Sequence, residues 1–458
     1  MKTLIKEITI INEGKSFVGS ILIDDEIIAG VISSDSADYY LISYQWEQVC
    51  DIIKDGKGYY IIPGVIDDQV HFREPGATHK GDIESESRAA VLGGTTSFMD
   101  MPNNNPPITT CDELEKKYAI AREKSYANYS FYLGATNDNI EEIKKADPHT
   151  ICGIKLFMGS STGNMLVDST EALDGVFSNN KFLVAIHSEQ EEIIRENLQK
   201  AKDKFGMNSD GKSAIPFDEH PKIRSAEACI ACTQKAISLA HKHKTRLHIL
   251  HISTKKELEM LQQAQKETPS ITGEICAHYL YFDDSDYSKY GSKIKCNPAI
   301  KGAQDKAAII DAVVNSKISA LATDHAPHLE SEKDGDYLTA PSGIPTIQHS
   351  LQMMLQLTNQ GIISKEQVVK MMCHSPADCF KVERRGYIRE GYFADLVIFK
   401  EKKYTVTKEN IAYKCKWSPF EGNTFDYTIT DTLVNGTFVV KDGEITFAKN
   451  SKRLSFEV

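Results

Sequence analysis

The sequence predicts an α/β fold: a (β/α)8 TIM barrel that carries a small composite β domain built from both ends of the chain. Three observations predict it. The middle of the chain alternates short apolar runs with amphipathic stretches, both ends read as short β segments, and most central apolar runs end in a polar residue. With 458 residues, 41% of them hydrophobic, the chain is long enough for a large core and a smaller accessory domain.

Both ends of the chain are rich in predicted β-strands. The N-terminal part contains "IKEITIINEG", "FVGSILIDDEIIAGVIS" and "DGKGYYIIPG". The C-terminal part contains "RGYIREGYFADLVIFK" and "DTLVNGTFVVKDGEITFA", in which Asn435-Gly436 and Asp442-Gly443 predict tight turns. Because chain ends often lie close together, we expect a composite β-sandwich domain of residues 1–61 and 386–458, with a barrel domain of residues 62–385 inserted between them.

Eight apolar runs in the middle of the chain predict the barrel strands. Stretches with helical spacing, such as "EQEEIIRENLQKAKDKF" and "TKKELEMLQQAQKE", separate them and predict the covering helices. The eight runs are "GVIDDQVHF", "TTSFMDMPN", "YSFYLGAT", "ICGIKLFMG", "FLVAIHSE", "RLHILHIS", "ITGEICAHY" and "ISALATDHAPH". Eight such units within residues 62–385 fit the usual size of a (β/α)8 barrel.

Composition excludes several classes of partner. The formal net charge is -11 with no basic block, so we expect no nucleic-acid binding. No apolar segment has the length of a bilayer span, and the first residues alternate like a strand, which predicts a cytoplasmic protein with no membrane partner. Cys229 and Cys232 lie in "SAEACIACTQKAISLA", whose spacing favours two buried helix thiols over a zinc or redox motif.

Polar residues at the ends of the predicted strands indicate a functional pocket. A barrel brings the C-terminal ends of all its strands to one face, so these residues are expected to converge. They are His71, Asn103, Lys155, His187, His251, His278 and Asp324. A single His at a strand end is more often structural, but three His and an Asp at corresponding positions favour a divalent metal such as zinc. The four proposed ligands are His71, His187, His251 and Asp324.

Lys155 lies in "GIKLFMG", an apolar segment without an acidic neighbour in sequence. An unpaired buried ammonium is costly and tends to lose its proton. The neutral amine can add carbon dioxide to form a carbamate, whose two oxygens could bridge two metals. The alternative is an ordinary lysine that reaches the barrel rim or pairs with a carboxylate. The neighbouring ligands favour the carbamate.

Six segments together resemble the dihydroorotase family of the cyclic amidohydrolase superfamily, in the branch that keeps an active-site lysine. They are "PGVIDDQVHFREPG", "MDMPNNNPP", "GIKLFMGSS", "HILHIST", "CNPAIK" and "LATDHAPH". In addition, "GYIREGYFADLVIF" is similar to the strand with which those enzymes re-enter their small β domain. The resemblance spans most of the chain. Superfamily members that act on hydantoins, dihydropyrimidines or allantoin share the barrel but usually lack "HFREPG" and "ATDHAPH".

The resemblance implies two groups of site residues. One or two zinc ions would be held by His71, Lys155 as a carbamate, His187, His251 and Asp324. Substrate would be bound by Arg73, Asn103, Asn297, His328 and, less directly, the backbone at Ser342-Gly343. The chemistry suits these roles, because Arg73 can bind a carboxylate bidentately and the two Asn side chains can pair with an imide-like ring edge. For Arg73 the alternative is a surface ion pair.

Position 69 departs from the family pattern Asp-x-His-x-His. The chain has Asp67-Asp68-Gln69-Val70-His71, so an amide stands where the family has its first His. An amide oxygen is a neutral and weaker zinc ligand than imidazole, and Gln69 is therefore a doubtful metal ligand. We expect either a single tightly bound zinc or a loss of activity. The other site residues are all present, which favours a working enzyme.

The resemblance implies the reversible cyclisation of N-carbamoyl-L-aspartate to L-dihydroorotate, in which Asp324 acts first as general base and then as general acid. Two alternatives stay open: another cyclic amidohydrolase acting on a hydantoin, dihydropyrimidine or allantoin, and a non-catalytic partner of a pyrimidine-pathway enzyme. By the same resemblance we expect a homodimer. The segment "LESEKDGDYLTAPSG" after His328 is either a lid or an ordinary solvated loop.

Overall fold

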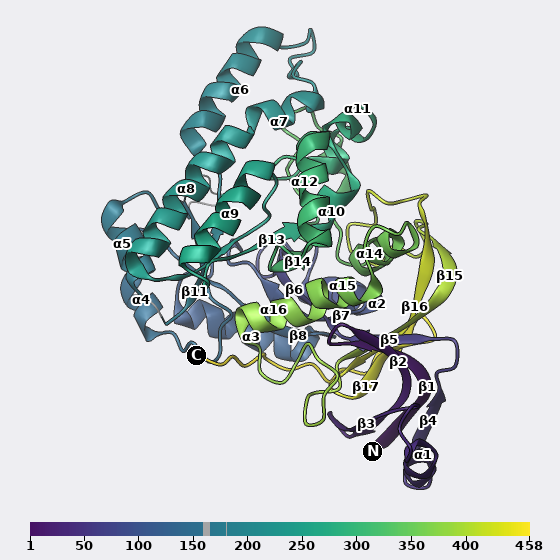
Figure 1. The fold of residues 1–458 in the computed structure, drawn as a ribbon. Helices are drawn as coiled ribbons and strands as arrows, with labels where there is room; N and C mark the ends of the chain where they lie inside the picture. Colours follow the sequence, from purple (N-terminus) through teal and green to yellow (C-terminus); the bar gives the residue numbers. More distant parts are fainter. Residues whose placement is uncertain (159–164, 180) are drawn as a thin grey trace.

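The computed structural model describes residues 1–158, 165–179 and 181–458, and it contains a barrel and a large mixed β-sheet (Figure 1). Helices cover the barrel, while the purple N-terminal strands and the yellow C-terminal strands lie side by side in the sheet. The predicted fold class, a (β/α)8 barrel with a β domain from both chain ends, is confirmed. The predicted domain boundaries stay a prediction.

Each of the eight predicted runs contains a barrel strand. The strands are β6 (Val65–Val70), β7 (Thr95–Asp100), β8 (Asn128–Phe131) with β9 (Leu133–Gly134), β10 (Ile154–Phe157), β11 (Leu183–His187), β12 (Arg246–Ile249), β13 (Thr272–Cys276) and β14 (Ala320–Ala322). Neighbours pair in parallel, and the barrel closes where Val70 bridges to His325 just beyond β14. The end of the fourth run, Gly159, lies outside the described residues, as do Ser160 and Ser161 of "GIKLFMGSS".

The third run, predicted as one strand, is divided at Tyr132. Before this residue β8 pairs with β7, and after it β9 pairs with β10. The hydroxyl of Tyr132 donates a hydrogen bond to the carbonyl of Asp68 at 2.9 Å, and its ring is fully buried. A single strand therefore changes partners around a buried aromatic side chain.

Helices cover the barrel and connect its strands. They are α2 (Ile83–Leu92), α3 (Cys111–Lys124), α4 (Ile140–Lys145), α5 (Thr170–Ser178), α6 (Glu191–Phe205), α7 (His220–Ile223), α8 (Ala226–His243), α9 (Lys255–Glu267), α10 (Ala277–Tyr281), α11 (Tyr287–Tyr290), α12 (Ala303–Val314), α13 (Glu330–Lys333), α14 (Ser350–Asn359), α15 (Lys365–Val369) and α16 (Ser375–Phe380). The two helices predicted by spacing are α6 and α9. Thr254 caps α9, because its hydroxyl accepts from the backbone N–H of Glu257.

The β domain is one nine-stranded sheet in the order β18-β17-β16-β15-β5-β1-β2-β3, with β4 paired to β1. Its strands are β1 (Lys2–Asn12), β2 (Lys15–Asp24), β3 (Ile27–Ser33), β4 (Ile52–Asp55), β5 (Tyr60–Pro63), β15 (Leu396–Thr405), β16 (Thr424–Val434), β17 (Thr437–Lys441) and β18 (Glu444–Ile445). Strand β5 joins the two chain ends, since it pairs with β1 on one side and β15 on the other. Both predicted tight turns are present, with positive φ at Asn435-Gly436 and Asp442-Gly443.

Two features of the chain ends were not predicted. Helix α1 (Tyr39–Glu47) interrupts the N-terminal strands and packs Trp46 against β3, where a side chain at Gly30 would come within 2.6 Å of the indole ring. At the other end, the last residues leave the sheet and run along the barrel, where Arg453 bridges to Tyr129. The C-terminus therefore lies beside α3 and β8, away from the N-terminus (Figure 1).

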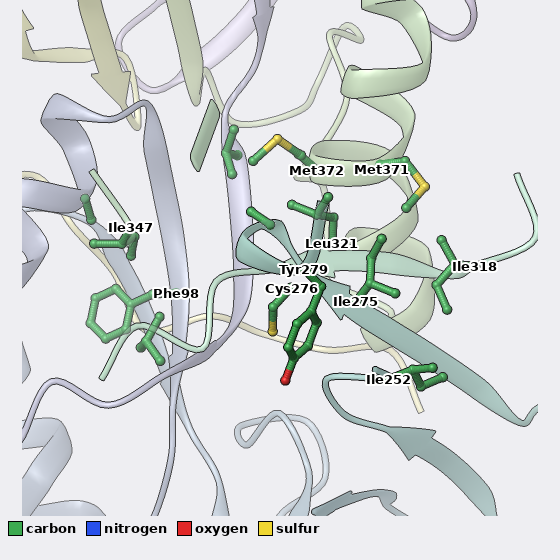
Figure 2. Close-up of a cluster of buried hydrophobic side chains, with 14 of the residues drawn as sticks. Phe98, Ile252, Ile275, Cys276, Tyr279, Ile318, Leu321, Ile347, Met371 and Met372 are labelled. Atoms are coloured by element: carbon green, nitrogen blue, oxygen red, sulfur yellow. The ribbon is translucent and has the colours of Figure 1, made fainter. Parts of the chain in front are cut away.

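The main hydrophobic core fills the space between the barrel strands and their covering helices. Figure 2 shows Met371 and Met372, from a π-helical turn, beside Leu321 of β14, with Ile275 of β13 nearby. This continuous packing fixes the strand ends that carry the polar residues.

The predictions for cysteines and membrane spans can be compared with these elements. Cys229 and Cys232 are buried in α8, as predicted, and all ten cysteines are free thiols. Within the described ranges, no helix combines the length and apolar character needed to cross a bilayer.

Candidate active site

All eleven predicted site residues line one cavity of about 410 Å³ at the C-terminal ends of the barrel strands. They are Gln69, His71, Arg73, Asn103, Lys155, His187, His251, Asn297, Asp324, His328 and Gly343. His278, the other polar residue at a strand end, lies in α10 directly after β13, contacts the sulfur of Cys296 and does not line the cavity. The roles of the eleven cavity residues as metal ligands or substrate contacts stay predictions.

The local backbone explains how residues far apart in sequence converge. Lys155 and His187 belong to strands β10 and β11, whereas His251 and Asp324 each follow their strand by two residues. Both of the latter have positive φ, 40° at His251 and 47° at Asp324. This left-handed backbone is uncommon outside glycine and turns the chain sharply at the strand end.

His187 and His251 have the geometry expected of two ligands of one metal. Their facing nitrogens, Nδ1 of His187 and Nε2 of His251, are 3.0 Å apart. Two ligands at about 2.1 Å from a tetrahedral metal lie about 3.4 Å from each other. Burial lowers the pKa of both imidazoles, and this favours the neutral form that binds metals. These two residues therefore fit the predicted metal site.

The opposite nitrogen of His187 is held by a residue that the sequence analysis did not single out. His187 Nε2 lies 2.9 Å from Glu189 Oε2, and Arg224 binds the same carboxylate with Nη2 at 2.6 Å. A carboxylate behind a metal-binding His fixes its tautomer and ring orientation. The only sequence signal was that Glu189 follows His187 by two residues, and Arg224 had none.

The carboxylate of Asp324 contacts the side chains of both His71 and Gln69. His71 Nε2 lies 3.2 Å from Asp324 Oδ1, and Gln69 Nε2 donates to the same oxygen at 3.2 Å. Burial opposes ionisation of Asp324, but the hydrogen bond from His71 and the nearby imidazoles outweigh it and lower its pKa. The side-chain oxygen of Gln69 is buried and accepts no hydrogen bond from a described residue. In this arrangement Gln69 acts as a donor to Asp324.

Lys155 is buried, and burial lowers its pKa to about 7 despite the opposing effect of Asp324 and Glu274. Its ammonium nitrogen lies 4.7 Å from the centre of the Phe157 ring. Among the described residues, no carboxylate lies within ion-pair distance of it. The alternative of a lysine paired with a carboxylate is therefore not seen there, and a large fraction of neutral amine is expected at neutral pH.

The other end of the cavity is cationic. Arg73 Nε donates to the carbonyl of Pro327 at 3.1 Å, and its Nη2 lies 3.1 Å from His328 Nε2. Among the described residues Arg73 has no carboxylate partner, so the predicted alternative of a surface ion pair is not seen. Asn103 faces the metal end, because its Oδ1 lies 2.9 Å from His71 Nδ1.

Lys80 contacts His328 and is itself paired with Glu332, and the sequence analysis singled out neither residue. Lys80 Nζ donates to His328 Nδ1 at 3.1 Å and pairs with Glu332 at 2.8 Å. With Nδ1 accepting, the proton of the neutral ring is on Nε2, which donates to the carbonyl of Ser342 at 3.0 Å. Burial and the cations Arg73 and Lys80 lower the pKa of His328 and keep it neutral.

The end of the segment after His328, residues Pro341, Ser342 and Gly343, lines the cavity. Two buried lysines bind carbonyl groups of this segment: Lys295 Nζ donates to Tyr337 and Ala340, and Lys333 Nζ donates to Pro341 and Gly343. Gly343 has φ of 143°, and a side chain there would come within 2.5 Å of the carbonyl of Ala326. Position 343 therefore accepts only glycine without rearrangement.

A second polar cluster lies inside the barrel, beneath the cavity. Asp68 of β6, His248 of β12 and Glu274 of β13 are completely buried, and they form a group whose ligand atoms all lie within 4.8 Å of one another. Glu274 Oε1 accepts from the backbone N–H of His251 at 3.2 Å, which places the cluster directly below the predicted metal site. The sequence analysis did not single out these three residues.

Comparisons with known proteins identify the family to which the chain belongs. The model of the amidohydrolase family matches residues 60–439. The chain is 31% identical to a dihydroorotase from Methanosphaera stadtmanae over 87% of its length and 90% of that protein. It is also 32% identical to an allantoinase from Bacillus velezensis, over 84% of its length and 85% of that protein.

A solved structure of L-hydantoinase from Arthrobacter aurescens superposes with a TM-score of 0.90 at 25% identity, over 99% of each chain. These similarities confirm the predicted resemblance to dihydroorotases and their relatives. The protein is a cyclic amide hydrolase. The chain therefore belongs to the amidohydrolase family.

Proposed function

We propose that the enzyme is a dihydroorotase, which interconverts N-carbamoyl-L-aspartate and L-dihydroorotate in pyrimidine biosynthesis. The observation that carries this proposal is the pair formed by Arg73 and His328. Arg73 is a half-buried cation that has no carboxylate partner among the described residues. A guanidinium in this situation suits a carboxylate on the substrate. Relatives named dihydroorotase, at 31% identity to the chain, support the same reaction.

A metal would be held at the other end of the cavity by five side chains. They are His71, Lys155 as a carbamate, His187, His251 and Asp324. Their chemistry fits zinc, since the set combines imidazoles, a carboxylate and a lysine with lowered pKa. When bound, the metal would polarise an amide carbonyl and lower the pKa of water. Because Gln69 already donates to Asp324, we propose one tightly bound zinc and an active enzyme.

Asp324 is the proton carrier in this proposal. In the direction of hydrolysis, its carboxylate takes the proton that water loses on attacking the ring carbonyl. The protonated Asp324 then donates to the ring nitrogen as the carbon–nitrogen bond breaks, which yields the free carbamoyl amide. Its lowered pKa leaves the carboxylate ionised at the start of this cycle.

The remaining cavity residues bind and orient the ring. Arg73, Asn103 and His328 would hold the substrate carboxylate, and this local attraction offsets the acidic surface of the protein. The side-chain oxygen of Asn297 is buried and accepts no hydrogen bond from a described residue, so it is available to a ring N–H. The backbone at Gly343 lies beside His328 and completes this end.

The test is a comparison of substrates on one zinc-loaded preparation. Dihydroorotate carries a carboxylate that dihydrouracil, hydantoin and allantoin lack, and a charged hydrogen-bonded pair contributes about 3 kcal/mol, or roughly 100-fold in kcat/KM. We expect dihydroorotate to be preferred by at least that factor. Equal or better turnover of a neutral ring would instead favour another cyclic amidohydrolase, as the allantoinase and hydantoinase relatives would suggest.

A second candidate is a non-catalytic partner of a pyrimidine-pathway enzyme, which the amide at Gln69 favours. Metal quantification distinguishes the two. Protein that contains zinc and still turns over neither dihydroorotate nor N-carbamoyl-L-aspartate would support the non-catalytic role. We expect turnover.

We further expect the enzyme to act as a homodimer in the cytoplasm, on a small molecule and without nucleic-acid or membrane partners. Sedimentation equilibrium at micromolar concentration tests the oligomeric state. A monomer under conditions of full activity would contradict this expectation.

A further inference from the structure

The cluster of Asp68, His248 and Glu274 stands apart from the cavity residues. Its three side chains come from strands β6, β12 and β13 and meet inside the barrel, where each is completely buried. None of the three lines the cavity described above. The proposed catalytic cycle uses none of them.

The hydrogen bonds within the cluster leave Asp68 without a donor. His248 Nε2 lies 3.1 Å from Glu274 Oε2, in hydrogen-bonding geometry, and 3.2 Å from Asp68 Oδ2, at ion-pair distance. The ring nitrogen carries one proton, and its geometry directs that proton to Glu274. Both oxygens of Asp68 are buried and accept no hydrogen bond from a described residue. A buried carboxylate in this condition is stabilised by a further positive group or by a proton shared with a neighbour.

The charges of Asp68, Glu274 and His248 also favour a bound cation. Two carboxylates face one imidazole, so even a protonated His248 leaves one negative charge uncompensated unless a proton is shared. Among the described residues, no lysine or arginine pairs with Asp68 or Glu274. A divalent cation would neutralise both carboxylates and leave His248 as a neutral ligand.

The distances from His248 Nε2 to the two carboxylates match those between ligand atoms in a coordination sphere. Nitrogen and oxygen ligands about 2.1 Å from one ion lie about 3.4 Å apart in a tetrahedral arrangement. The observed 3.1 and 3.2 Å are close to this separation. On the far side of the ring, His248 Nδ1 lies 2.8 Å from the hydroxyl of Thr272, a contact that fixes the ring as an outer partner of a metal ligand would.

We propose that Asp68, His248 and Glu274 bind a divalent metal ion inside the barrel, separate from the ion or ions expected in the cavity. One imidazole and two carboxylates suit Zn²⁺ or Mn²⁺, which accept nitrogen and oxygen donors together. Asp68 stands directly before Gln69, so the strand that lacks an imidazole toward the cavity carries an extra carboxylate toward the barrel interior. The ion has a structural role, because Glu274 holds the backbone of His251.

The competing explanation is a shared proton among the same three side chains. X-ray diffraction at the zinc absorption edge, from crystals of the wild-type protein grown with Zn²⁺, separates the two. An anomalous peak within bonding distance of Asp68, His248 and Glu274 is expected. The absence of a peak at these side chains would overturn the proposal, whatever the cavity contains. This measurement needs no activity, so it is independent of the proposed dihydroorotase reaction.

A variant gives a second readout. Asp68→Asn removes the charge with little change in size, and elemental analysis after dialysis is expected to find one fewer ion per chain than in wild type. The matched control is Asp431→Asn, a completely buried carboxylate of β16 that pairs with Lys54, which should leave the metal count unchanged. Equal metal content in Asp68→Asn and wild type would overturn the proposal. If Asp68→Asn does not fold, the wild-type diffraction experiment decides.

Discussion

The two ends of the active-site cavity differ in charge and in what they lack. At the metal end, buried imidazoles and a lysine of lowered pKa surround Asp324 and offer nitrogen and oxygen lone pairs. At the substrate end, Arg73 and Lys80 surround a neutral His328, and among the described residues Glu332 is the only carboxylate that pairs with either cation. This difference supports the proposal that one end of the cavity binds a metal and the other end binds an anion. Substitutions at the two ends should therefore separate effects on chemistry from effects on binding.

The largest effect is expected for Lys155→Ala at the metal end. The variant should lose both bound zinc and measurable turnover, because it has no amine to form the carbamate that is proposed to hold the metal. Small carboxylic acids such as acetate should restore part of both. Elemental analysis and a dihydroorotate assay measure the two losses. Lys54→Ala, at a lysine of the β domain, is the control that should keep zinc and activity. Full activity of Lys155→Ala would refute the role of the lysine.

The second-largest effect is expected for Asp324→Asn, whose kcat should fall by about 10³-fold with little change in KM. The amide can still contact His71 but cannot carry the proton between water and the ring nitrogen. Steady-state kinetics at matched zinc occupancy provide the measurement. Wild-type turnover with metal bound would exclude Asp324 as the proton carrier.

At the substrate end, Arg73→Met should raise KM for dihydroorotate by roughly 100-fold, which corresponds to about 3 kcal/mol for a charged hydrogen-bonded pair. Zinc content should not change, because Arg73 contacts Pro327 and His328 rather than the metal end. Arg453→Met, at a surface arginine that pairs with Glu115, is the matched control. A loss of zinc in Arg73→Met would show that the two ends are not independent.

A smaller effect is expected for Lys80→Met, about tenfold in KM. Without the ammonium, Nδ1 of His328 loses its donor and the ring can adopt the other tautomer. Nitrogen-15 NMR of the histidine rings reports this change directly. The control is Lys124→Met, which removes a lysine at the end of helix α3 that pairs with Glu74. This variant should leave the spectrum of His328 unchanged. An unchanged His328 tautomer in Lys80→Met would contradict the orienting role.

The smallest change in activity is expected for Gln69→His, which should add bound zinc and alter kcat by less than about tenfold. The imidazole restores the ligand expected by the family pattern but removes the donor to Asp324. A variant that binds no additional zinc would show that position 69 does not face the metal.

Much of the barrel could be predicted, because buried parallel strands appear as apolar runs and their C-terminal ends share one face. Lys155 and His251 reached the cavity for this reason, although 96 residues of chain separate them. The contacts of Lys80 and Arg224 could not be predicted, since they depend on how long side chains fold back across loops. Helix α1 was missed because its neighbours in sequence are all strands.

Asp68 was the least predictable of the polar residues. A strand pattern predicts which side of a sheet a residue faces, but β6 has an irregular register between Asp67 and Val70. Asp68 therefore points toward His248 across the barrel while Gln69 still reaches the cavity. The irregular register of β6 places both side chains inside the barrel.

Strand β5 has a consequence for synthesis of the chain on the ribosome. Its partner β15 begins at Leu396, more than three hundred residues after β5 ends at Pro63. At about 5 to 20 residues per second, translation of that interval takes roughly 15 to 70 s. During this time the edge of β5 exposes unpaired backbone groups that could join a strand of a neighbouring nascent chain. Expression yield should therefore depend on translation speed and on chaperones that cover this edge.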